Sequence, residues 1–461
     1  MIELTEVTVL KNGKKLFENF SCEIRPGENW LIQGENGSGK TLLLQLLAGA
    51  LHPFSGKIHH SFLKEQDWDS RYRERQQKIH LVPTHWLQAF LRGFDGLFYQ
   101  QRYYTMDEAE LPKVKDVFGK DVHKLKTLNI SDSFNIDGLL DLHVTRLSNG
   151  QMKKVIILRQ LMRDIPRLLL LDYPFDGLDA ESRQDFNAFM DHIAVKLGIQ
   201  VIIVDHGHAL PSVMNRRLIL NRFQIERIED ISPAPTTTPP RKPGTLAAKG
   251  TPATPVVEMQ DLTIKYGDTK ILSNLNWQIN KGERWALTGK NGSGKTTLFS
   301  LIYADHPMAY SQKVFLFGRR RGTGESIWDI KKRINYFGPE QIHFLNPRGI
   351  AFTAREYILM QPHKDPGRLA QLVHFFNARP YIDQPIRYLS SGQLQMALLM
   401  NMFMDGKELL LLDEPFQFLD PHNHEKVTDY LNQYLDQGIT LVMITHDEKD
   451  VERWTQLHKR L

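Results

Sequence analysis

The chain of 461 residues contains a single cysteine, Cys22. One cysteine excludes internal disulfides and any metal site that needs several cysteine ligands. No apolar run approaches the roughly 20 residues that a membrane-spanning helix needs. The longest runs, Leu168–Leu171 and Val201–Val204, have the length of buried strands. The N-terminus lacks a basic segment followed by an apolar core, so we expect no secretory signal and a cytosolic protein.

The chain also lacks a large excess of charge of one sign. Its 58 Lys and Arg residues stand against 53 Asp and Glu residues, which gives a formal net charge of +5. So small an excess favours a solvated surface of mixed sign over strong attraction to nucleic acid or to a membrane surface.

Two copies of the phosphate-binding signature G-x-x-x-x-G-K-[ST] are present, at Gly34–Thr41 and Gly289–Thr296. In this spacing, backbone N–H groups surround the phosphates at a helix N-terminus, the lysine reaches the β- and γ-phosphates, and the hydroxyl binds Mg²⁺. Each copy predicts a nucleoside triphosphate site. The predicted phosphate-loop contacts are Gly34, Asn36, Gly37, Ser38, Gly39, Lys40, Thr41, Gly289, Asn291, Gly292, Ser293, Gly294, Lys295, Thr296 and Thr297.

Other landmarks of the first half recur in the second. The recurring pairs are Lys40 with Lys295, Ser148 with Ser390, Asp172 with Asp413, and His206 with His446. The difference in residue number within a pair falls only from 255 (295 − 40) to 240 (446 − 206) along the chain. This order indicates an internal duplication, with domains at 1–230 and 256–461. The segment 231–255 between them is rich in proline and threonine, and we expect it to be a semi-extended tether.

Each half has the pattern of an α/β domain. Strands predicted at Trp30–Gln33 and Trp285–Thr288 lead into the phosphate loops, and helices begin at the loop lysines. Later apolar runs predict central parallel strands. We therefore expect two domains, each with a mixed, mainly parallel sheet and a helical subdomain between the phosphate loop and a second motif. The tryptophans Trp30 and Trp285 also repeat, and packing explains them better than nucleotide contact does. After His446, we expect only a short helix.

An aspartate follows each run of strand leucines, Asp172 in the first half and Asp413 in the second. Open α/β sheets bind ligands at the carboxyl ends of their strands. We therefore predict two Mg²⁺ sites, one formed by Thr41 and Asp172 and the other by Thr296 and Asp413.

The sequences LSNGQ (147–151) and LSSGQ (389–393) resemble the signature motif of the ATP-binding-cassette (ABC) superfamily. Together with the phosphate loops, the Asp-x-Pro elements and the downstream histidines, they extend the resemblance over nearly the whole chain. It implies that the halves pair around two ATP molecules, each held by the phosphate loop of one half and the signature of the other. The implied signature contacts are Ser148, Asn149, Gly150, Gln151, Ser390, Ser391, Gly392 and Gln393.

The two halves differ at the position of the catalytic base. In Asp413-Glu414-Pro415, Glu414 resembles the family's general base, and His446 resembles the switch histidine that contacts the γ-phosphate. The first half has Tyr173 instead, and a phenol with a pKa near 10 is a poor base at neutral pH. His206 is retained there as a predicted ATP contact.

We therefore predict two unequal composite sites. Lys40, Thr41, Asp172 and His206 with the second signature would bind ATP and hydrolyse it slowly. The second set, with the first signature, would perform most turnover through its catalytic residues Glu414, His446 and Lys295. The alternative is that Tyr173 is a tolerated substitution and that other groups activate water.

The adenine and glutamine positions of the family also differ between the halves. Tyr266 lies 23 residues before its phosphate loop (289 − 266), where the family places an aromatic residue under the adenine, whereas the first half has Lys11. The glutamine expected after the following strand is replaced by Thr84 in the first half. In the second half, either Glu340 or Gln341 fills this role.

The loops at 174–179 and 415–420 resemble those of importer cassettes, and the fused pair resembles the ModF or PhrA group of molybdenum-transport-type proteins. This resemblance implies that ATP hydrolysis energises a transporter, with transmembrane permease subunits as partners and a cytoplasmic position at the inner face of the membrane.

Two other functions are open. A soluble ABC protein acting on ribosomes or nucleic acid is disfavoured by the proline-rich tether and by Gln417-Phe418-Leu419-Asp420, because ABC-F proteins carry Asn-His-Leu-Asp at that point. A nucleotide sensor with little turnover is disfavoured by Glu414. The aromatic segment 94–104 fits a docking surface for a transporter, single-strand binding or ordinary packing.

Overall fold

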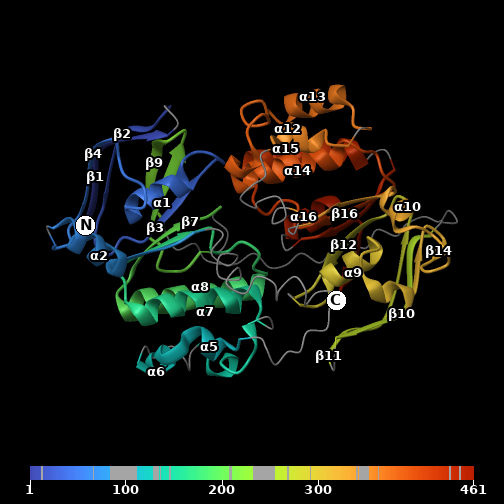
Figure 1. The fold of residues 1–461 in the computed structure, drawn as a ribbon, viewed down its shortest axis with the longest axis horizontal. Helices are drawn as coiled ribbons and strands as arrows, with labels where there is room; N and C mark the ends of the chain where they lie inside the picture. The colour runs from blue at the N-terminus through green and yellow to red at the C-terminus, as the bar shows by residue number, and fades with distance from the viewer. Residues whose placement is uncertain are drawn as a thin grey trace. The chain divides into compact units, whose positions relative to one another are not determined.

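The computed structural model divides the chain into two compact units, Met1–Thr237 and Thr238–Leu461. They are called the N-terminal and C-terminal units, and each is described by itself (Figure 1). The described residues are 1–11, 14–65, 67–83, 112–127, 134, 136–144, 147–206, 210–231, 255–266, 269–290, 292–338, 341, 352–361, 363–435, 438–445 and 448–461. Most of the predicted tether, the aromatic segment 94–104, Thr84, Asn291, Glu340 and His446 therefore lie outside the described residues.

A six-stranded sheet forms the centre of the N-terminal unit. All neighbouring strands are parallel except the last two, β8 and β9. The order is β5 (Ile79–Val82), β6 (Leu168–Asp172), β7 (Gln200–Val204), β3 (Trp30–Gly34), β8 (Arg216–Asn221) and β9 (Gln224–Asp230). Every residue of β6 is buried, as its unbroken leucine run predicts for a strand covered on both faces.

Helices and a second, antiparallel sheet surround this centre (Figure 1). The antiparallel sheet has the order β2 (Lys14–Ile24), β1 (Ile2–Lys11) and β4 (Ser55–His60). The helices are α1 (Lys40–Ala48), α2 (Trp68–Lys78), α7 (Asn149–Arg163) and α8 (Ala180–Leu197), with a helical region of α5 (Val114–Phe118), α6 (Lys124–Thr127) and two short 3₁₀ turns.

The C-terminal unit repeats this plan. Its central sheet is parallel throughout, in the order β15 (Ile334–Phe337), β16 (Leu409–Asp413), β17 (Thr440–Ile444), β12 (Arg284–Thr288) and β18 (Leu457–Arg460). Its antiparallel sheet has the order β11 (Thr269–Asn280), β10 (Pro255–Tyr266), β13 (Lys313–Leu316) and β14 (Arg319–Arg320). Its helices include α9 (Lys295–Ile302), α10 (Ile327–Lys331), α12 (Ala354–Ile358), α13 (Pro366–Phe375), α14 (Ser391–Phe403), α15 (Pro421–Leu435) and α16 (Glu448–Trp454).

The α/β prediction is confirmed, and the end of each unit differs from it. Beyond β17 the chain forms α16, as expected, and then adds the edge strand β18 beside β12. The strand was missed because it has only four residues, which alternate between half-buried and exposed and carry little apolar signal. The hairpin of β8 and β9 was missed for the same reason, since β9 is largely exposed.

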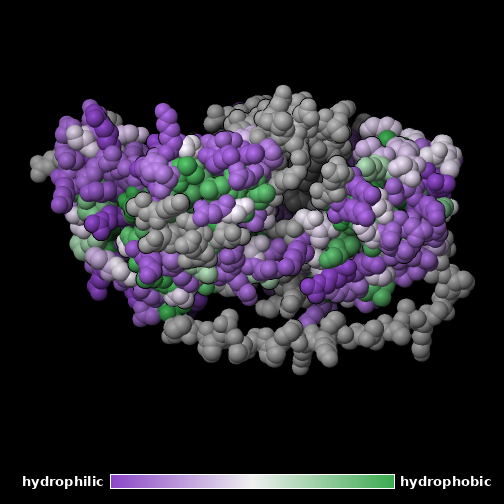
Figure 2. All heavy atoms as spheres, turned by 90° about the horizontal axis from the view of Figure 1, so that it is seen from below, coloured by the Kyte–Doolittle hydropathy of each residue, from purple (hydrophilic) through white to green (hydrophobic). Residues whose placement is uncertain are grey.

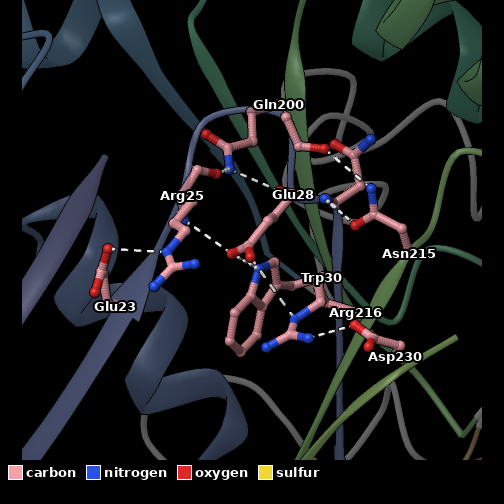
Figure 3. A network of polar contacts seen from close by, with 10 residues as sticks. Glu23, Arg25, Glu28, Trp30, Gln200, Asn215, Arg216 and Asp230 are labelled. Carbon is pink, nitrogen blue, oxygen red and sulfur yellow. Dashed lines mark hydrogen bonds and ion pairs between the residues drawn. The ribbon is translucent and has the colours of Figure 1, made fainter.

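The repeated tryptophans lie at the starts of β3 and β12, at the opposite strand ends from the phosphate loops. Trp30 is 1% exposed, and its Nε1 donates to the Glu28 carboxylate at 3.0 Å. The Arg216 guanidinium lies 5.6 Å from the ring centroid and also pairs with Asp230 (Figure 3). Trp285 donates in the same way to the glutamate two residues before it, at 2.8 Å. Both tryptophans are therefore packing residues.

The surface in Figure 2 is mainly hydrophilic, with small apolar areas. The most exposed large apolar side chains include Trp328 (71%), Phe54 (70%) and Tyr388 (65%). Within the described part of the chain, no helix combines the length and the apolar character needed to cross a membrane.

The buried leucine strands give a direct test of the fold. Leu170 in β6 and Leu411 in β16 are both fully buried. We expect Leu170→Ala and Leu411→Ala each to lower the free energy of unfolding of its own unit by about 2–5 kcal/mol, because each leaves a cavity. Calorimetry of the full chain measures this. Leu10→Ala, at a side chain that is 40% exposed, is the control. A change as large in the control as in the core variants would contradict this account.

Candidate functional site

The phosphate loops join β3 to α1 and β12 to α9. Each helix begins after a glycine in the left-handed region, Gly39 with φ 104° and Gly294 with φ 98°. A Cβ on Gly39 would lie 2.6 Å from the Phe223 ring and 2.9 Å from the Phe17 ring. On Gly294 it would lie 2.9 Å from the Leu272 side chain. Only glycine fits both the backbone angle and the available space, so the loop can turn tightly onto the helix.

The loop lysines are held inside their loops. Lys40 is 5% exposed, and its Nζ donates to the carbonyls of Gly34 at 2.7 Å and Glu35 at 2.8 Å. Lys295 is 7% exposed and makes the matching bonds in its own loop, at 2.6 and 3.0 Å. Each ammonium is therefore held within its own loop, at the start of the helix where phosphate oxygens are favourable.

The predicted metal-binding pairs are close together in both units. Thr41 Oγ1 donates to the Asp172 carboxylate at 2.9 and 3.1 Å, and Thr296 Oγ1 donates to Asp413 at 3.3 Å. Both aspartates are buried. A hydroxyl and a carboxylate side by side are hard oxygen donors that fit Mg²⁺, whose remaining ligands would be phosphate oxygens and water.

The residue after each aspartate has the same unusual backbone. Tyr173 has φ 51° and Glu414 has φ 50°, both in the left-handed region. The Tyr173 N–H donates to the carbonyl of Val204 at 2.9 Å, and the Glu414 N–H donates to that of Ile444 at 2.9 Å. In each unit, this bond joins the end of one central strand to the end of the next. The two units therefore differ here in the side chain and not in the main chain.

The Tyr173 side chain lies among the groups predicted to contact phosphate. Its ring centroid is 5.0 Å from that of His206 and 5.9 Å from Lys40 Nζ. The His206 carbonyl in turn accepts from Gln33 Nε2 at 2.8 Å. A neutral phenol thus occupies the place where the other unit carries a carboxylate.

Both signature motifs form the N-terminus of a helix. Ser148 caps α7: its Oγ accepts from the Gln151 N–H at 3.2 Å, and its N–H donates to Gln151 Oε1 at 2.9 Å. Ser390 and Gln393 form the same reciprocal pair at the start of α14, at 3.2 and 3.0 Å. These capping boxes fix the backbone of both signature motifs. Asn149 is exposed, and the half-buried signature residues are Ser148, Ser391, Gln151 and Gln393.

Sequence reasoning missed a buried lysine two residues after the first signature. Lys153 Nζ donates to the carbonyls of Pro174 at 2.7 Å and Asp176 at 2.5 Å, which lie in the loop that follows β6. In the C-terminal unit, Gln395 takes this place and donates to the Pro415 carbonyl. A lysine on a helix ordinarily indicates an exposed face, so the residue type gave no sign of burial. The signal in the sequence was its position, because Lys153 and Gln395 each lie two residues after a signature motif.

Two carboxyl groups surround Lys153, and the C-terminal unit has neutral residues in their places. Burial lowers the pKa of Lys153 to about 8, against the opposing effect of Asp176 and Asp205. Burial and repulsion from Asp205 raise the pKa of Asp176 well above its usual value. The corresponding residues after β16 and β17 are Gln417 and Thr445. The N-terminal unit thus has a cluster of titratable residues in the loops that follow β6 and β7, near Tyr173.

The predicted adenine and glutamine positions lie at the ends of described strands or just beyond them. Tyr266 ends β10, and Lys11 ends β1. Gln341 Nε2 donates to the carbonyl of Tyr336 at 3.0 Å, which returns the side chain to the end of β15. The choice between Glu340 and Gln341 remains open.

Comparison with known proteins identifies the family. The family model described as ABC transporter matches residues 17–176 and again 272–417. The chain belongs to the ABC transporter ATP-binding family. It is a tandem of two such domains and an ATPase. The ABC transporter ATP-binding protein ModF of Escherichia coli strain K12 is 31% identical, over 97% of this chain and 94% of that protein. An uncharacterised ABC transporter ATP-binding protein of Schizosaccharomyces pombe is 29% identical, over 98% of this chain and 95% of its own.

Solved structures agree with the fold of this ABC ATPase. A model of ribosome-bound archaeal Pelota and ABCE1 matches 99% of this chain and 78% of its own, with a TM-score of 0.62 and 19% identity. A structure of RNase-L Inhibitor matches 98% and 87%, with a TM-score of 0.57 and 18% identity. At these identities the likeness is one of fold.

Removal of Lys153 tests the charged cluster. Lys153→Met leaves two loop carbonyls and the Asp176 carboxyl without their buried cation, and we expect the N-terminal unit to lose about 3–5 kcal/mol of unfolding free energy. Lys153→Gln, which copies Gln395, should cost less. Denaturant unfolding measures both variants, with Gln395→Met for comparison in the other unit. Wild-type stability of Lys153→Met would show that the cluster does not stabilise the loop.

Proposed function

We propose that the two active sites of this ATPase are unequal, with most turnover in the C-terminal unit and slow hydrolysis of bound ATP in the N-terminal unit. The contrast between Glu414 and Tyr173 carries this proposal. Each residue follows the end of a central strand and has a φ in the left-handed region. Its N–H donates to a carbonyl of the neighbouring strand. Because the backbone is alike, only the side chain differs in its capacity to accept a proton.

The chemistry requires a base at this position. As the water oxygen bonds to the γ-phosphorus and the bond to ADP breaks, the Glu414 carboxylate takes the water proton. Lys295 offsets the charge on the phosphate oxygens, and by family resemblance His446 contacts the γ-phosphate. Mg²⁺ held by Thr296 and Asp413 would neutralise further phosphate charge. A neutral phenol at position 173 cannot accept that proton at neutral pH.

The signature motifs complete each site by family resemblance. Ser390–Gln393 would contact the ATP of the Lys40 loop, and Ser148–Gln151 that of the Lys295 loop. The capping boxes support this role, since they hold a serine and the first N–H groups of a helix in a fixed arrangement.

Exchange of the two side chains tests the asymmetry. We expect Glu414→Gln to lower the steady-state ATPase rate by about 10²–10⁴-fold, the usual effect of losing a general base. The double variant Glu414→Gln with Tyr173→Glu should regain activity, because position 173 has the backbone of a base position. Phosphate release from ATP measures the rate in each variant.

Glu425→Gln is the matched control, because it makes the same chemical change at an exposed position on α15. Its rate should equal that of the wild type. A Glu414→Gln variant with a nearly unchanged rate would assign turnover to other groups and would overturn the proposal.

We further propose that ATP hydrolysis by this protein energises transport across a membrane, with permease subunits as partners and import of the molybdenum type. The support is the full-length similarity to a protein named as an ABC transporter ATP-binding protein, and the importer-like loops at 174–179 and 415–420. The alternative is work on ribosomes or nucleic acid. The likeness to ribosome-bound ABCE1 is one of fold and does not favour it.

Co-purification separates these functions. We expect Glu414→Gln, supplied with ATP, to co-purify with a polytopic membrane protein from detergent-solubilised membranes and to be absent from the ribosomal pellet. A variant with both Lys40→Ala and Lys295→Ala is the control for nucleotide dependence. Sedimentation with ribosomes, without a membrane partner, would replace transport by the alternative.

A further inference from the structure

The N-terminal unit has a second, basic pocket at the far end of α1 from the phosphate loop. Residues from the end of α1, from strand β4 and from helix α2 line it, and it has a volume of ≈ 370 Å³. The nine residues of α1 separate it from the loop by roughly 13 Å along the helix axis. Its lining residues include no Asp or Glu, and the basic residues and histidines among them are His52, Lys57, His59, His60, Arg71 and Arg75. The pocket is thus separate from the ATP site and positive.

The two arginines stand one helical turn apart on α2, so both point into the pocket. Gly49 ends α1 with φ 70°, and a Cβ at that position would overlap the Arg75 guanidinium. Arg75 therefore packs directly on the carboxyl end of α1, where the helix dipole favours a cation.

No acidic side chain balances these cations. Among the described residues, Arg71, Arg75 and Lys57 form no ion pair, and the Nε atoms of both arginines are buried without a hydrogen-bond partner. Glu74, on the same helix, pairs with Lys78 instead. Both arginines are half-buried, and Lys57 is exposed. Because the two guanidinium groups repel each other and no described carboxylate pairs with them, the pocket favours an anion.

His60, at the base of the pocket, adds a buried donor or acceptor. It is 1% exposed; its Nε2 is bonded to the carbonyl of Leu47 at 2.9 Å, and its Nδ1 has no partner. Burial and the positive charges of Arg75 and Arg71 lower the pKa of His60 to about 4. The ring is therefore neutral at physiological pH, and the arginines carry the charge.

The duplicated unit shows that the fold does not need these charges. At the offset of 255, Arg75 corresponds to Ile330 (330 − 75), which is 5% exposed. His60 pairs with Ile2 at the start of β1, as Leu316 pairs with Val257 near the start of β10, so Leu316 takes its place. The C-terminal unit thus fills the same corner with apolar side chains, and its nearby Lys331 is paired with Asp305.

We propose that the pocket of the N-terminal unit binds a phosphate-class oxyanion, either free or as the phosphate group of a small phosphorylated molecule. Guanidinium groups form paired hydrogen bonds with tetrahedral oxyanions, and two of them lie here with no competing carboxylate. The volume falls in the range of small-molecule pockets, so it has room for an organic group beside the phosphate.

Calorimetric titration of the full chain tests this proposal. Both phosphate loops are first saturated with a magnesium complex of a non-hydrolysable ATP analogue, and inorganic phosphate or glycerol 3-phosphate is then added. We expect Arg75→Ile, which copies the other unit, to weaken binding by about tenfold or more. Arg73→Ile removes an exposed charge from the same helix and should bind as the wild type does.

The two probes distinguish the sources of the oxyanion, since tighter binding of glycerol 3-phosphate than of phosphate assigns a phosphorylated molecule. Arg71→Gln provides a second variant should Arg75→Ile not fold, and a phosphate-dependent rise in the unfolding temperature gives an independent readout. The proposal is overturned if neither probe binds the wild type at millimolar concentration, or if Arg73→Ile weakens binding as much as Arg75→Ile does.

Discussion

One main-chain hydrogen bond in each unit fixes the backbone of the residue that follows the strand aspartate. It runs from the residue after the strand aspartate to the last carbonyl of the next strand, and it holds that residue at a φ near 50°. A side chain with this backbone leaves the end of the sheet beside the phosphate-loop lysine and the paired threonine and aspartate. Because the bond belongs to the sheet, it is present whether or not the residue can act as a base.

Local spacing is what made the sequence informative. The phosphate loops, the buried leucine strands and the capped signature helices follow from residues within about ten positions of one another, and the structure places them at the predicted strand ends. Lys153 could not be predicted, because its burial depends on carbonyls more than twenty residues further along the chain. The packing of Arg75 on Gly49 is equally non-local. The edge strand β18 was missed because so short and exposed a segment has little pattern to detect.

The duplication provides a control within the chain. At several buried or half-buried positions the N-terminal unit has a titratable residue where the C-terminal unit has a residue that does not titrate. Lys153, Asp176 and Asp205 stand where the other unit has two glutamines and a threonine, and Arg75 and His60 replace buried aliphatic residues. Since both units build a central sheet and an antiparallel sheet on the same plan, these titratable residues are not requirements of the fold. They distinguish two domains that are alike in architecture.

The left-handed turn at Tyr173 has a consequence for how domains of this kind are compared. The strained φ is present at Tyr173 as it is at Glu414, because the hydrogen bond to the neighbouring strand imposes it whichever side chain is present. The exchange of a carboxylate for a phenol therefore leaves no trace in the path of the polypeptide, and a superposition of Cα atoms would not distinguish the two units at this residue. Only the chemical identity of one side chain separates the two.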